Sequence, residues 1–127
     1  MNEPDKYTIE EDRPITEREA AVVAWLLENG WQHGPLNHPG EGVAKLRVVG
    51  RCACGCASVD FEEHGQSSGA GPIAEGYGKT PEGLQFGLIL WGRDGAITGL
   101  EIYELHPGSA KTLPDPAWLT PDPPAVD

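Results

Sequence analysis

The hydrophobic positions near the start of the chain repeat at the spacing of a helix. They lie three and four residues apart on one helical face and comprise Val22, Val23, Leu26 and Leu27. Before them, Thr16 and Glu19 have the T-x-x-E spacing of a capping box, in which each residue binds the backbone of the other. Gly30 follows, at a position where helices commonly end in the left-handed conformation. The pattern predicts a helix over residues 17–29.

Beyond the helix the hydrophobic period changes from helical to alternating, which is typical of strands. Residues 44–51 alternate between apolar and basic side chains, and residues 58–62 alternate between apolar and polar ones. Residues 84–105 predict two strands joined by a turn at 93–95, because the Asp-Gly pair in that turn is a strong hairpin signal. The register of this hairpin stays open, because a two-residue and a four-residue loop put different faces inward. The glycine-rich stretch at 67–83 is expected to be a flexible surface loop.

These elements predict an α+β fold. One N-terminal helix packs on an antiparallel sheet of about four strands, which are arranged as two hairpins. Residues 1–13 are polar and acidic and are expected to form a flexible N-terminus. Residues 14–119 form the single α+β domain, and the proline-rich residues 120–127 form a tail.

The charge of the chain narrows the class of partner. The 127 residues include 9 Lys+Arg and 20 Asp+Glu, which gives a net charge of −11. Phosphate binding needs clustered Lys and Arg, so this balance argues against nucleic acid and anionic membranes and favours a basic partner. No apolar run approaches the roughly 20 residues that span a bilayer, and the first residues show no apolar signal segment. We expect a cytoplasmic location; the sequence does not indicate an oligomeric state.

Cys52, Cys54 and Cys56 surround a glycine in the segment RCACGCASVDF and raise the question of a metal site. A two-residue hairpin turn centred on Cys54 and Gly55 pairs Arg51 with Ser58 and keeps the apolar residues of both strands on one face. In this register the three thiols point to the inner face, the outer face and the tip. Three diverging thiols form no tetrahedral site, so the sequence predicts free cysteines, with no metal and no cofactor.

A bulged or longer loop would re-aim these side chains and favour the alternative, a metal-binding or regulatory module built on the same cysteines. Zinc in a closed structural site takes four ligands. The fourth would come from a carboxylate or from a histidine, the candidates being His33, His38 and His64.

No Ser/His/Asp or Cys/His arrangement in the chain has the strand or elbow context of a catalytic site, so we expect a protein that is not an enzyme. Several acidic residues lie on or next to the expected strands. If the two hairpins adjoin in one sheet, these acids gather on one face or edge and attract a basic protein. The candidate partner-binding residues are Asp60, Glu62, Glu63, Glu101 and Glu104.

Three segments in the same order resemble a small uncharacterised bacterial family. They are the helix start RPITERE, the segment CACGCAS and the late hairpin WGRDGAITGLEI, which match the family patterns R-P-[LI]-T-x-x-E, C-x-C-G-C-x-S and W-x-x-D-G. Small acidic proteins of this kind resemble immunity proteins, which neutralise a cognate toxin by binding it. The resemblance therefore implies a protein-binding function, with a basic toxin domain as the partner, and supplies no catalytic residue.

Overall fold

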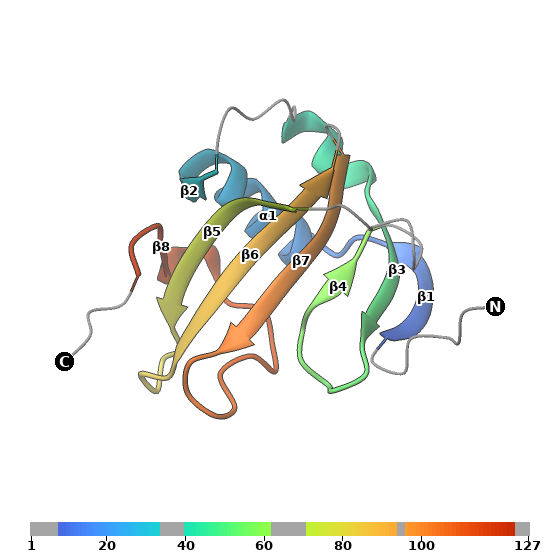
Figure 1. The fold of residues 1–127 in the computed structure, drawn as a ribbon. Helices are drawn as coiled ribbons and strands as arrows, with labels where there is room; N and C mark the ends of the chain where they lie inside the picture. The colour runs from blue at the N-terminus through green and yellow to red at the C-terminus, as the bar shows by residue number, and fades with distance from the viewer. Residues whose placement is uncertain (1–7, 34–39, 62–70, 94–95, 124–127) are drawn as a thin grey trace.

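The computed structural model describes residues 8–33, 40–61, 71–93 and 96–123 of the chain (Figure 1). This part of the chain contains one α-helix, eight strands and two 3-10 helices. In chain order they are β1 (Thr8–Pro14), α1 (Glu17–Asn29), β2 (Trp31–Gln32), η1 (Gly40–Lys45), β3 (Arg47–Cys52), β4 (Val59–Asp60), β5 (Gly71–Lys79), β6 (Gln85–Arg93), β7 (Ala96–Glu104), η2 (Pro116–Trp118) and β8 (Leu119–Thr120).

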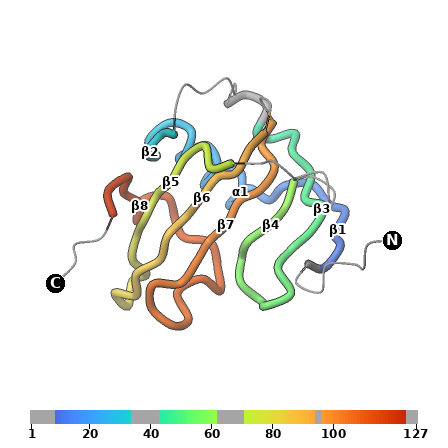
Figure 2. The backbone as a smooth tube through the Cα atoms, in the orientation of Figure 1, coloured from blue at the N-terminus to red at the C-terminus, as the bar shows by residue number. Residues whose placement is uncertain are grey.

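All eight strands belong to one sheet with the order β1-β3-β4-β7-β6-β5-β2, and every pairing is antiparallel. The short strand β8 shares the outer edge of β5 with β2. The broad class α+β is therefore confirmed, but the expected sheet of about four strands in two hairpins is wrong. The backbone path in Figure 2 shows β1, β2 and β8 as additions at the two sides of the sheet.

The largest error concerns β5, which occupies most of the stretch expected to be a loop. At two of its glycines, Gly76 and Gly78, other elements come too close for a side chain. A Cβ on Gly76 would lie 2.9 Å from the Trp25 ring, and one on Gly78 would lie 2.8 Å from the Trp118 carbonyl oxygen. Here glycine marks close packing against α1 and η2 rather than a turn.

Residues 8–13, expected in the flexible N-terminus, instead form most of β1. This strand pairs with β3 from Thr8 opposite Cys52 to Pro14 opposite Arg47, with a register shift between Glu10 and Arg13. The acidic side chains of β1 meet the basic side chains of β3. Arg47 Nη2 lies 2.7 Å from an Asp12 carboxylate oxygen, for example. The strand is stabilised by a partner that is distant in sequence, which local composition does not reveal.

The predicted helix is confirmed with its capping box. Thr16 Oγ1 accepts from the Glu19 amide at 3.1 Å, and a Glu19 carboxylate oxygen accepts from the Thr16 amide at 2.9 Å. The expected left-handed residue at the C-terminus is wrong, because Gly30 is extended, with φ −67° and ψ 161°. A Cβ at this position would lie 2.6 Å from the Leu26 carbonyl oxygen and 2.9 Å from that of Glu75. Gly30 lets the chain turn sharply into β2 beside β5.

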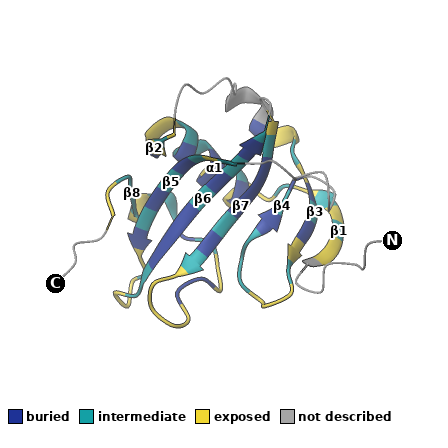
Figure 3. Ribbon diagram, in the orientation of Figure 1, coloured by how far each residue is buried: buried dark blue, intermediate teal, exposed yellow. Residues whose placement is uncertain are grey.

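Helix α1 covers one face of the sheet and encloses the core (Figures 1 and 3). The buried helix residues include Val22, Val23 and Leu26. They pack against the even-numbered residues of the central strands, among them Phe86, Leu88, Leu90, Leu100 and Ile102. Between the bulges of β5 and β7, the odd-numbered residues of β5, β6 and β7 therefore point to the opposite face, which we call the outer face. Its members there are Glu75, Tyr77, Gly87, Ile89, Trp91, Glu101 and Tyr103.

Candidate functional site

The hairpin that carries the cysteines has a longer loop than the sequence predicts. Arg51 pairs with Val59 rather than with Ser58, and Gly50 pairs with Asp60, which is a shift of one residue. The Cys52 amide donates to the Ser58 carbonyl oxygen at 3.3 Å, so residues 53–57 form the loop. The predicted two-residue turn is therefore wrong.

The neighbouring strand β7 explains this register. Ser58 Oγ accepts from the Ile102 amide at 2.9 Å and donates to the Ile102 carbonyl oxygen at 3.2 Å. The Ala57 amide donates to the carbonyl oxygen of Ala110 at 2.9 Å. Because these contacts tie the return strand to β7 and to the segment after it, they set the loop length independently of the hairpin turn.

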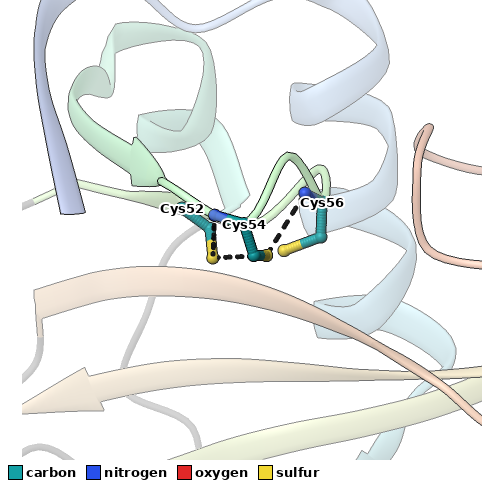
Figure 4. Close-up of side chains that lie close together, drawn as sticks. All are labelled: Cys52, Cys54 and Cys56. Atoms are coloured by element: carbon teal, nitrogen blue, oxygen red, sulfur yellow. Dashed lines mark hydrogen bonds between the residues drawn. The ribbon is translucent and has the colours of Figure 1, made fainter. Parts of the chain in front are cut away.

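The loop brings the three thiols together. The Sγ atoms of Cys52, Cys54 and Cys56 all lie within 4.8 Å of one another, and those of Cys52 and Cys54 are 2.7 Å apart (Figure 4). The expectation that the thiols point in three directions is wrong. Gly55 makes the fold of the loop possible, because its φ of 92° is a conformation that side chains rarely adopt. Its amide donates to the Cys52 carbonyl oxygen at 3.3 Å.

Backbone amides face the sulfur atoms. The Cys54 amide donates to Cys52 Sγ and the Cys56 amide donates to Cys54 Sγ, each at 3.4 Å. The pKa of Cys54 is lowered because the Cys52 thiol and the Cys56 amide both stabilise its thiolate. Burial and the hydrogen bond to Cys54 raise the pKa of Cys52 to about 12. Of these two cysteines, Cys54 is therefore the first to lose its proton. The Cys52 thiol then donates a hydrogen bond to the Cys54 thiolate.

Such a cluster has the chemistry of a soft-metal site. Thiolates select monovalent copper, zinc and iron–sulfur clusters over hard cations. At a Zn–S distance of about 2.3 Å, tetrahedral ligands stand roughly 3.8 Å apart. All three Sγ atoms lie within 4.8 Å of one another, and those of Cys52 and Cys54, at 2.7 Å, must move apart to surround one ion. All three ligands come from one surface loop, and Cys54 is exposed.

Within the described residues no histidine or carboxylate joins the cluster. His33 instead contacts Glu75 at 2.5 Å, and His106 accepts from the Gln85 amide at 2.8 Å. The other two candidates for a fourth ligand, His38 and His64, lie outside the described residues.

A pocket of about 320 Å³ lies beside the cluster and was missed by sequence reasoning. Cys56 lines it together with Arg13, Arg18 and Arg51, so a strongly acidic chain places three of its arginines here. Arg13 is bound by Glu19 and Arg51 by a glutamate of β1.

The structure describes three of the five predicted partner-binding acids, which are Asp60, Glu101 and Glu104. Glu62 and Glu63 lie outside the described residues. Asp60 is half-buried on the short strand β4, and the exposed Glu104 accepts from the Gly108 amide at the end of β7.

The fifth acid, Glu101, lies on the outer face and is bound by Trp91 Nε1 at 3.0 Å. Its neighbour there is Glu75 of β5, which sequence analysis did not single out. Both pair with Ile89 of the strand between them. Alternation along β5 would have revealed Glu75 if that segment had been recognised as a strand.

None of the helices in the described part of the chain is long and apolar enough to cross a membrane. Comparison with profiles of known protein families, with curated proteins and with solved structures finds no match. The resemblance to immunity-type proteins therefore stays a prediction that depends on the three sequence motifs alone.

Proposed function

We propose that this protein binds a soft metal ion through the thiolates of Cys52, Cys54 and Cys56. The observation that carries the proposal is the convergence of three Sγ atoms to within 4.8 Å on one loop. A loop selected only for turning the chain needs one residue with positive φ, which Gly55 supplies, and no sulfur.

Monovalent copper is the ion that fits this donor set best. Three soft sulfur ligands suffice for it, whereas zinc takes a fourth ligand, which a water molecule supplies in open sites. Three thiolates around a monovalent ion carry a net charge of −2. Glutamates already bind Arg13 and Arg51 in the pocket next to Cys56, so its arginines offset only a small part of that charge.

Protonation sets the pH dependence of binding. A metal must displace the proton from Cys52, whose pKa is raised to about 12 by burial and by Cys54. Affinity for the metal therefore increases as the pH rises from 6 to 8, because proton release accompanies binding.

The test is an anaerobic titration of the phosphine-reduced protein with Cu(I), in competition with a chromogenic Cu(I) chelator. We expect one ion per chain, and X-ray absorption with sulfur as the only first-neighbour scatterer. Cys54→Ser should weaken binding by at least about tenfold, because it removes a ligand and the loss of an outer-shell partner alone already costs that much.

Ala53→Ser is the matched control, because it adds a hydroxyl at an exposed position of the same loop and leaves the thiols intact. Circular dichroism establishes that each variant is folded. Equal Cu(I) affinity for wild type, Cys54→Ser and Ala53→Ser would refute the proposal. The same titration with Zn(II) decides between the two ions.

A further inference from the structure

The outer face of the sheet combines aromatic and acidic side chains, and it is independent of the cysteine loop. Antiparallel pairing arranges its residues in rows across β5, β6 and β7. One row is Tyr77–Gly87–Tyr103, and the next is Glu75–Ile89–Glu101. Trp91 extends the surface on β6 in the following row, opposite Gly99. Helix α1 lies on the other side of the sheet, as Figure 1 shows.

The tyrosine row has a fixed arrangement. A Cβ on Gly87 would lie 2.1 Å from Tyr103 Cζ, so the Tyr103 ring occupies the space above this glycine. The ring therefore reaches across β6 towards Tyr77. Burial raises the pKa of Tyr103 to about 12, and the neighbouring Tyr77, Glu75 and Glu101 act in the same direction. The phenol is thus neutral at physiological pH and surrounded by negative potential.

The two carboxylates are held in place by the aromatic side chains around them. Tyr77 Oη donates to Glu75 Oε1 at 3.4 Å, and Trp91 Nε1 donates to Glu101 Oε1 at 3.0 Å. On its far side Glu75 also contacts His33. Hydrogen bonds of this kind pre-organise a site, because less side-chain freedom is lost when a ligand binds.

We propose that the outer face binds a basic segment of a protein partner, with arginine or lysine side chains over the tyrosines and between Glu75 and Glu101. A cation within about 6 Å of an aromatic centroid is attracted by the ring, and the carboxylates add charge pairing. The net charge of −11 steers a basic partner towards the molecule from a distance.

A polypeptide fits this surface better than one small cation does. The Cα atoms of Glu75 and Glu101 are separated by two strand spacings, which is roughly 10 Å. Two carboxylates at that separation suit two basic side chains of one chain. The cations of this face, Lys79 and Arg93, lie at the ends of their strands and leave the centre to the carboxylates.

The experiment measures binding of an amidated peptide of alternating arginine and serine by isothermal titration calorimetry at low salt. The test variant is Glu75→Gln/Glu101→Gln. The control is Glu28→Gln/Glu82→Gln, which removes two exposed acids from elsewhere and has the same net charge. We expect the outer-face variant to lose about tenfold in affinity and the control less than about twofold. Tyr103→Leu, which changes no charge, should weaken binding several-fold.

Equal losses in the two double variants would show that net charge alone attracts the peptide and would overturn the proposal. The proposal would also be overturned if tetramethylammonium, at the same concentration as the peptide, displaced the peptide, because that result would indicate a site for a small cation. NMR of the wild type gives a result that does not depend on variant folding. The peptide should shift the indole signal of Trp91 more than that of Trp25, which packs between α1 and β5, and the reverse order would contradict the proposal.

Discussion

Replacement of Glu19 by alanine tests the physical account of the helix start. Glu19 is 6% exposed, yet its carboxylate accepts from the Thr16 amide and from both terminal nitrogens of Arg13, each at 2.9 Å. Glu19→Ala therefore removes one half of the capping box and leaves the Arg13 guanidinium without its principal partner. Thr16→Ala removes only the other half of the box.

The magnitudes follow from these contacts. Loss of the Thr16 cap should cost about 1 kcal/mol. Removing one partner of a fully buried ion pair costs about 3–5 kcal/mol of stability. The cost is smaller here, because the Arg13 side chain is 32% exposed and solvent screens its charge. We therefore expect Glu19→Ala to cost about 2–3 kcal/mol. For a domain of 127 residues this lowers Tm by roughly 10 °C.

The pH dependence provides a second measurement. Burial by itself raises the pKa of Glu19, but the hydrogen bonds from Arg13 and from the Thr16 amide outweigh it, so the pKa is lowered. A carboxyl with a lowered folded-state pKa stabilises the protein fully above its unfolded-state pKa of about 4.3. That stabilisation is lost as the pH falls through the folded-state pKa. The difference between wild type and Glu19→Ala should therefore be constant near pH 7 and shrink below pH 4.

Urea denaturation at several pH values measures both effects. Glu17→Ala is the matched control, because Glu17 is an exposed acid in the same first turn. It should cost at most about 0.5 kcal/mol through the helix dipole. If Glu19→Ala were no more destabilising than Glu17→Ala, or if its effect were independent of pH, the capping and ion-pair account would be wrong.

Three further predictions concern the glycines, the thiols and the dependence of folding on metal. Gly30→Ala should destabilise by about 1–3 kcal/mol in urea, because its Cβ would meet two backbone oxygens, whereas Gly71→Ala, with nothing within 4 Å, should change little. Iodoacetamide should modify Cys54 before Cys52, because Cys54 is exposed and its pKa is lowered, and tandem mass spectrometry reveals the order. Chelators should leave the thermal melt unchanged, because none of the fully buried core residues belongs to the cysteine loop; collapse of the fold with release of metal would contradict this.

The helix and the central hairpin could be predicted from sequence because their signals are local. Thr16 and Glu19 bind each other's backbone three residues apart, so the spacing alone identifies the capping box. The β6–β7 hairpin has Arg93 opposite Ala96, as a two-residue Asp-Gly turn requires, although the turn residues themselves lie outside the described part of the chain.

The remaining strands depend on partners that are far away along the chain. β1 is defined by its pairing with β3, and the two-residue strands β2 and β8 exist through their pairing with β5. Gly76 and Gly78 of β5 resemble turn residues in sequence. Only the approach of α1 and η2 shows why side chains are missing at these two positions.

The geometry of both candidate sites also depends on pairing between strands that are distant in sequence. The sequence determined which residue types are present: three cysteines around one glycine and a strong excess of acids. Whether the thiols meet depends on a register shift of one residue, and the contacts of Ser58 with Ile102 on β7 set that register. Glu75 and Glu101 likewise become neighbours only through the pairing of β5, β6 and β7. Hydrogen bonds between distant strands set both arrangements, because one residue of slip moves every side chain to the other face.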